Sequence, residues 1–199
     1  MNIGLTQRVD FIDSRNEYRD SIDRSFYNLC KHLNCSPINI PNINVNINEF
    51  IKNLNIHALI LTGGNSIFLD DEIVENYSIE RDNFERSLIK EFYGKIPIVG
   101  ICRGMQMLNL YFGGKIKIVK NHINTEHKIF SEKKYDLPEY VNSFHKWGIS
   151  EKYLSKEFDA IAYDEDRNIE SFLNLKKKAL GIMWHPERYS ENFDMDIMN

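Results

Sequence analysis

The fold of this chain is restricted most by one sequence feature. An unbroken apolar run is followed directly by a segment with the pattern of a helix. The run IPIVGI (96–101) has no polar alternation, as expected of a strand that helices cover on both faces. It leads directly into RGMQMLNLYFGG (103–114), whose composition suits a helix that ends at two glycines. Similar short apolar runs occur in NIGLT (2–6), SPINIPN (36–42) and HALILT (57–62). Strands that alternate with helices predict an α/β domain built on a parallel sheet.

The remaining segments extend this pattern. Apolar residues at three- and four-residue steps predict a helix that begins near Tyr18 and includes Ile22, Phe26, Leu29 and Leu33, with Cys30 on its buried face. INEFIKNLN (47–55) and RDNFERSLIKEF (81–92) predict two more helices, whereas 42–48 and 65–78 are expected to be connections. The last third changes character, and its expected strands are YVNSFHKWGI (140–149), FDAIAYDED (158–166), NIESFLN (168–174) and ALGIMWHPE (179–187).

Length and composition exclude several classes of protein. The 199 residues suit a single domain over 1–199, and an apolar share of 42% is that of a globular chain. A net charge of −4 argues against a nucleic-acid-binding surface. The first residues do not form a signal sequence, and no apolar run approaches the roughly 20 residues of a membrane span. We therefore expect a cytoplasmic protein that binds neither nucleic acid nor membrane.

Cys102 lies at the junction of the strand and the helix. Gly100 and Gly104 flank it at two-residue distance, as in a sharp elbow turn that crowds out side chains on either side of a nucleophile. The helix N-terminus favours the thiolate, and the backbone N–H of Arg103 is available to an oxyanion. A buried core cysteine is the alternative.

The segment WHPE supplies the partners that a nucleophilic cysteine needs. In an extended segment residues two apart project to the same side, so Glu187 can orient His185, which then serves as the base. LTGG (61–64) ends another strand, and the Gly64 N–H would complete the oxyanion hole. Taken singly, a surface histidine, a solvated carboxylate and a plain glycine turn are the alternatives.

Six motifs resemble those of the class I glutamine amidotransferase superfamily, and more narrowly its γ-glutamyl hydrolase-like branch. They are TGG (62–64), RDNFE (81–85), GICRGMQMLN (100–109), GG (113–114), VNSFH (141–145) and GIMWHPE (181–187). The resemblance implies a three-layer, flavodoxin-like, mostly parallel sheet with flanking helices. It also implies hydrolysis of a small-molecule γ-glutamyl amide through a glutamyl thioester on Cys102, without metal or organic cofactor.

The same resemblance suggests further roles. Gln106 would hold the amino-acid end of the glutamyl group, and Ser143, His145 and Trp147 would line the same pocket. An exposed helix residue, a structural histidine and a packing tryptophan are the alternatives for Gln106, His145 and Trp147. Arg103 resembles the stand-alone hydrolases and disfavours a glutaminase component that delivers ammonia to a partner synthetase. A non-enzymatic binding protein of the same fold is a further alternative, and a homo-oligomer is left open.

Two more groups of residues carry expectations. TQRVD (6–10), RNEYRDSID (15–23) and INIPN (38–42) resemble amidotransferase-like proteins of bacterial surface-polysaccharide pathways, so that Arg8 would meet an anionic leaving group or else form an ordinary salt bridge. Arg81, Asp82 and Glu85 are expected to form a structural ion-pair network. His122 and His127 are expected to be surface histidines rather than metal ligands, because no carboxylate cluster accompanies them in the sequence.

Overall fold

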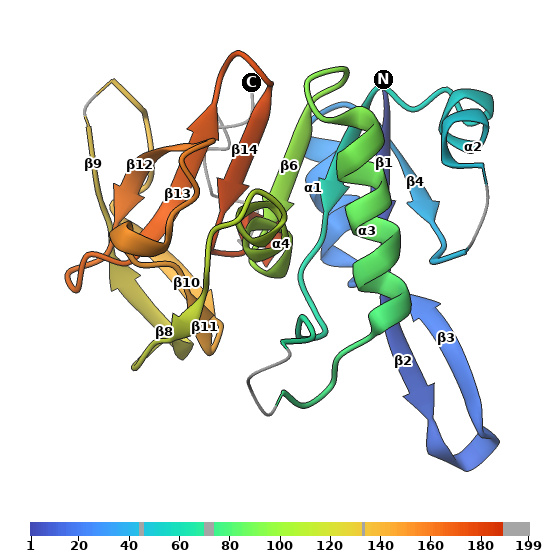
Figure 1. The fold of residues 1–199 in the computed structure, drawn as a ribbon, viewed down its shortest axis with the longest axis horizontal. Coiled ribbons are helices and arrows are strands. Elements are labelled where there is room, and N and C mark those ends of the chain that lie inside the picture. The colour runs from blue at the N-terminus through green and yellow to red at the C-terminus, as the bar shows by residue number, and fades with distance from the viewer. Residues whose placement is uncertain (44–45, 70–73, 133, 189–199) are drawn as a thin grey trace.

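A computed structural model describes residues 1–43, 46–69, 74–132 and 134–188, and one eight-stranded sheet organises them (Figure 1). Five neighbouring strands run parallel: β4 (Ser36–Ile40), β1 (Asn2–Thr6), β5 (Ala58–Leu61), β6 (Ile98–Ile101) and β14 (Ala179–Ile182). Three antiparallel strands complete the sheet: β13 (Ile169–Asn174), β12 (Asp159–Tyr163) and β9 (Phe130–Ser131). Because the parallel strands share one direction, their carboxyl ends meet at one edge of the sheet.

Helices cover the parallel strands on both faces. On one face lie α2 (Ile47–Asn53), α3 (Ile79–Phe92) and α4 (Arg103–Tyr111), and on the other lies α1 (Ser25–His32). Along β5, Leu59 and Leu61 enter the first core and Ala58 and Ile60 enter the second, as the two-residue period of a strand requires. The predicted three-layer, mostly parallel α/β fold is therefore confirmed.

The helix expected to begin near Tyr18 starts later. Residues before it form a hairpin of β2 (Arg8–Ile12) and β3 (Glu17–Ser21), which extends away from the sheet in Figure 1. Tyr18 is 73% exposed and packs across the strands on Phe11, with ring centroids 4.8 Å apart. Asn16 closes the turn at φ 51°. The prediction that Tyr18 and Ile22 lie on a helix was wrong, because a cross-strand aromatic pair and a left-handed turn outweighed an accidental spacing.

The last third contains short strand pairs and turns. β7 (Lys117–Ile118) pairs with β11 (Trp147–Gly148), and β8 (Ile123–Lys128) pairs with β10 (Tyr140–Phe144). A 3₁₀ turn at Asp13–Arg15 joins β2 to β3, and in the last third of the chain 3₁₀ turns span Glu151–Tyr153 and Pro186–Arg188. The last turn shows that the extended geometry expected for His185 to Glu187 was wrong, because β14 ends at Ile182.

Other expectations can be compared directly with the structure. Cys30 lies on the buried face of α1, as predicted, and Trp147 and Trp184 are both buried. Parts of the expected connections, residues 44–45 and 70–73, lie outside the described residues. Within the described ranges, no helix combines the length and the apolar character that a membrane span requires.

Candidate active site

Cys102 occupies a strained turn between β6 and α4. Its backbone angles are φ 50° and ψ −103°, a conformation that residues with a side chain rarely adopt. Its N–H donates to the carbonyl of Ile182 at 2.7 Å, and its carbonyl accepts from the N–H of Gln106 at 3.1 Å. The turn is thus held by β14 on one side and by the first turn of α4 on the other. Such strain is typical of the elbow that presents a nucleophile.

The glycines on either side of Cys102 are required by close backbone contacts. A Cβ atom on Gly100 would lie 2.5 Å from the carbonyl carbon of Gly104. A Cβ atom on Gly104 would lie 2.0 Å from the carbonyl oxygen of Leu61. Only glycine lets the elbow approach both its own helix and β5 this closely.

His185 reaches the same place from the end of β14. Its Nδ1 lies 2.7 Å from Oε1 of Glu187, so the pair that the sequence predicted is formed, although by a 3₁₀ turn. Asn142 on β10 fixes the backbone: the His185 N–H donates to its Oδ1 at 2.8 Å, and its Nδ2 donates to the His185 carbonyl at 2.9 Å. Asn142 was missed in the sequence analysis, and its only signal was its place in the VNSFH motif.

Electrostatics favour a protonated His185. Burial opposes the charged ring, since the residue is 3% exposed. The charge of Cys102 and the hydrogen bond with it, together with Glu187, outweigh burial and raise the pKa of His185 to about 9. His185 and Cys102 both adjoin Gly63, and the imidazolium form of His185 is the one that its neighbours stabilise.

The glycine pair after β5 adjoins both groups. A Cβ atom on Gly63 would lie 2.9 Å from Cε1 of His185 and 3.7 Å from Cβ of Cys102. Gly64 has φ 84°, and a Cβ atom there would lie 3.2 Å from Cδ of Arg8. Gly63 was not singled out in the sequence, yet it is the member of the pair that lies against the imidazole.

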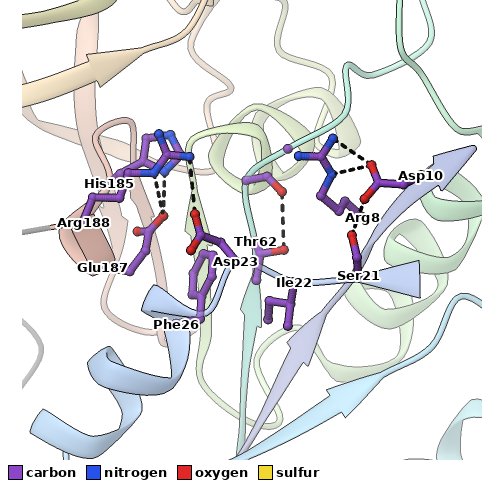
Figure 2. Close-up of a pocket in the computed structure, with 12 residues that line it drawn as sticks. Arg8, Asp10, Ser21, Ile22, Asp23, Phe26, Thr62, His185, Glu187 and Arg188 are labelled. Carbon is purple, nitrogen blue, oxygen red and sulfur yellow. Dashed lines mark hydrogen bonds and ion pairs between the residues drawn. The ribbon is translucent and has the colours of Figure 1, made fainter. Parts of the chain in front are cut away.

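A cavity of about 220 Å³ opens beside His185 and Glu187. Figure 2 shows Arg8 with Asp10 on one side of it and Arg188 with Asp23 on the other. The Nη2 of Arg8 lies 2.8 Å from Asp10 Oδ1, and Arg188 Nη2 lies 3.9 Å from Asp23 Oδ2. Both guanidinium groups remain partly exposed, and each is paired with a carboxylate that also lines the cavity.

The residues expected to hold the glutamyl group lie outside the lining of that cavity. Gln106 is buried, and its Nε2 donates to the carbonyl of Trp147 at 2.8 Å. The same carbonyl lies 3.0 Å from Nδ1 of His145. Ser143 is also buried, and its hydroxyl donates to the carbonyl of His122 at 2.8 Å. The structure therefore gathers Gln106, His145 and Trp147 around one carbonyl, and separates them from Arg8.

The Arg103 side chain points into the protein and is only 2% exposed. It forms ion pairs with Asp82 and Glu85 of α3. Glu85 also pairs with Arg81 at 3.0 Å, and Arg81 Nη2 donates to the carbonyl of Thr62 at 2.7 Å. The predicted structural network of Arg81, Asp82 and Glu85 is confirmed. It includes Arg103, and it joins the start of α4 to the residue before the glycine pair.

A second buried cluster overturns one expectation. His122 is buried rather than on the surface, and its Nε2 lies 3.0 Å from Oδ2 of Asp164. Glu170 lies near it and near His127. The prediction that no carboxylates accompany these histidines was wrong, because both acids come from segments more than thirty residues further along the chain.

Known proteins of related sequence match nearly the whole chain. The model of the class I glutamine amidotransferase family matches residues 10–199. The chain is 33% identical to γ-glutamyl-CDP-amidate hydrolase of Campylobacter jejuni, over 94% of this chain and 90% of that protein. It is 26% identical to a glutamine-hydrolysing GMP synthase subunit of Methanococcus maripaludis, over 96% and 94% of the two chains.

Solved structures support the fold. A glutamine amidotransferase of Thermotoga maritima superposes with a TM-score of 0.66 at 18% identity, covering 94% of this chain and 76% of that one. A protein of Thermoplasma acidophilum superposes with a TM-score of 0.70 at 19% identity, covering 94% and 84%. Both share the arrangement of the sheet and its flanking helices.

Proposed function

Because this chain belongs to the class I glutamine amidotransferase family and is a hydrolase of carbon–nitrogen bonds, we propose that it cleaves a γ-glutamyl amide through a thioester on Cys102. One observation supports this most: a cysteine in a strained elbow lies beside a histidine whose Nδ1 meets a carboxylate. Nucleophile, base and orienting residue are thereby joined in one chain of contacts.

The reaction proceeds in two halves. The Cys102 thiolate attacks the γ-carbonyl carbon, and the backbone N–H groups of Arg103 and Gly64 stabilise the oxyanion. The carbon–nitrogen bond then breaks, and protonated His185 gives its proton to the leaving nitrogen. Neutral His185 next removes a proton from water, the resulting hydroxide attacks the thioester, and the sulfur leaves as thiolate. The products are glutamate and the free amine or amidate.

We assign the glutamyl end to the pocket of Gln106. Its amide nitrogen is committed to the Trp147 carbonyl, whereas its oxygen has no hydrogen-bond partner within the described part of the chain. A free amide oxygen can accept a hydrogen bond from the α-ammonium group of the substrate. Ser143, His145 and Trp147 then act by holding this segment in place.

The leaving group is proposed to be anionic. Arg8 and Arg188 present guanidinium groups in the cavity next to His185, and guanidinium groups bind phosphate oxygens with paired hydrogen bonds. The relative from C. jejuni is named for a nucleotide amidate, a substrate that carries such a leaving group. We therefore extend the proposal to γ-glutamyl-CDP-amidate or a closely similar compound.

A screen for glutamate release by the purified protein tests this function. The panel contains glutamine, γ-glutamyl amino acids, γ-glutamyl amines and γ-glutamyl nucleotide amidates. Preferred cleavage of the nucleotide amidates is expected. Preference for uncharged amines would contradict the anionic leaving group but not the thioester mechanism.

The similarity to the GMP synthase component of M. maripaludis keeps one alternative in view, a glutaminase that delivers ammonia to a synthetase. The same screen separates the two, because a partner-dependent glutaminase should be nearly idle by itself with every compound in the panel.

A further inference from the structure

Glu170 is a buried carboxylate that lacks hydrogen-bond donors. It lies on β13 and is 1% exposed, and neither of its carboxylate oxygens has a hydrogen-bond partner within the residues that the structure describes. A buried carboxylate is normally paired with a cation or bound by several N–H groups, because burial removes its hydration. The surroundings of Glu170 therefore suggest a missing positive charge.

Three imidazole rings surround this carboxylate. Nε2 of His127 lies 3.5 Å from Oε2, and Nε2 of His122 and His145 lie 3.7 and 4.0 Å from Oε1. These distances exceed those of good hydrogen bonds. His122 precedes β8, His127 lies near the end of β8 and His145 follows β10, so the fold gathers these groups from different parts of the sequence.

Backbone contacts direct two of the rings toward the carboxylate. Nδ1 of His122 lies 2.6 Å from the Lys120 carbonyl, and Nδ1 of His145 lies 3.0 Å from the Trp147 carbonyl. A carbonyl oxygen only accepts, so each Nδ1 carries the hydrogen. In the neutral rings each Nε2 then has a lone pair on the side of the carboxylates, nearest to Asp164 for His122 and near Glu170 for His145. Histidine ligands of metals are oriented in this way.

We infer that His122, His145 and Glu170 bind one divalent cation of the zinc class, as a structural ion. Their ligand atoms all lie within 4.8 Å of one another. Two atoms on one tetrahedral zinc are about 3.4 Å apart, so small movements of the side chains would bring all three into range. Nitrogen and carboxylate ligands suit zinc rather than calcium or magnesium.

Asp164 lies outside this group of three, beside His122, and would become the fourth ligand only if its side chain moved toward the ion. Its Oδ2 lies 3.0 Å from Nε2 of His122, and its carboxylate also accepts hydrogen bonds from the backbone and the side chain of Asn168, at 2.7 and 2.6 Å. These bonds fix the direction of the carboxylate. A closed set of four protein ligands is typical of a structural zinc site.

The ion would stiffen the segment behind the proposed glutamyl pocket. The Trp147 carbonyl that orients His145 also binds Gln106, and the Ser143 hydroxyl binds the carbonyl of His122. The site is separate from the cavity beside His185, which none of the four ligands lines. The ion thus has no part in the chemistry at Cys102.

Zinc binding to the full chain tests the inference. Protein stripped with a chelator is titrated with zinc, and the bound metal and the thermal midpoint are measured. One zinc per chain and a higher midpoint are expected. Glu170→Gln and His145→Gln should each weaken zinc binding by about a hundredfold or more. His32→Gln is the matched control, because this exposed ring has the same Nδ1 contact, 2.8 Å to the Asn28 carbonyl, and should change nothing.

A second measurement covers variants that do not fold. Cobalt added to the stripped wild-type protein should give the visible absorption bands of a tetrahedral site, and zinc should abolish them. The inference is overturned if these bands are absent and the protein retains no zinc. It is also overturned if Glu170→Gln and His145→Gln bind zinc as tightly as the wild-type protein does. The cluster would then be a proton-linked network in which a charged His122 pairs with Asp164.

Discussion

Nδ1 of His185 lies 2.7 Å from Oε1 of Glu187, and a 3₁₀ turn, not a strand, joins the two residues. Nearly the whole carboxylate is buried beside the ring, so the contact is shielded from water. One ring nitrogen is thereby committed to Glu187, which leaves the other for Cys102. The following predictions depend on this arrangement and on the residues that support it.

The dependence of kcat/KM on pH should reveal the loss of the His185 proton. The pKa of His185 is raised to about 9, above the ordinary value of 6.5, so its proton is retained through neutral pH and lost as the pH rises through about 9. Since the ring must protonate the leaving nitrogen, kcat/KM should fall on this alkaline side. Glu187→Gln removes the negative charge and should move the fall to lower pH, whereas Glu132→Gln on the surface should not. An unchanged profile in Glu187→Gln would contradict the role of the pair.

The close approach at the elbow should make Gly104 sensitive to substitution. The Cβ of Gly104→Ala would lie 2.0 Å from the Leu61 carbonyl oxygen, and relief of this clash would require a shift of the backbone of β5 or α4. A loss of about 1–3 kcal/mol in the free energy of unfolding is expected from such overpacking. Gly113→Ala has nothing within 4 Å and should cost less, through its φ of 82° alone. Urea denaturation measures both, and equal losses would contradict the packing argument.

Removing Arg103 should destabilise the fold. Arg103→Met leaves Asp82 and Glu85 buried without one of their cations, a change that typically costs about 3–5 kcal/mol. The exposed pair Lys95 and Glu91 offers a control, because Glu91→Gln should leave the unfolding midpoint unchanged. If the unfolding midpoint of Arg103→Met were close to that of wild type, the ion-pair network would contribute little to the stability of the fold.

Arg8 and Arg188 should distinguish substrates by charge. Arg8→Met or Arg188→Met is expected to reduce kcat/KM about tenfold for γ-glutamyl nucleotide amidates, the scale of one lost hydrogen bond to a charged group. Cleavage of an uncharged γ-glutamyl amine should stay nearly constant. Arg167→Met, outside the cavity lining, is the control. Equal losses for both kinds of substrate would exclude a specific contact with an anionic leaving group.

Much of the sheet could be predicted because its strands are buried on both faces. The unbroken apolar runs that become β1, β5 and β6 have no competing helical period. The hairpin β2–β3 was not predicted, since a stripe of apolar residues at helical spacing crossed it and the pairing of Phe11 with Tyr18 is visible only in three dimensions.

Some residues of the site could likewise be predicted from the sequence, and others could not. Cys102, His185 and Glu187 lie in short motifs, so local sequence was enough to select them. Asn142 and the cluster around Glu170 depend on contacts between residues far apart in the chain. A single sequence contains no measure of such distances, and these residues therefore looked ordinary.

Alkylation by a glutamine analogue whose amide is replaced by an electrophilic diazoketone tests the central claim most directly. The protein has three cysteines, so Cys30 and Cys35 are internal controls in the same molecule. The account predicts one label per chain on Cys102, located by peptide mass spectrometry, with parallel loss of glutamate release. It also predicts that Cys102→Ser folds but loses more than about a hundredfold in rate. Label on another residue, or full activity in Cys102→Ser, would contradict it.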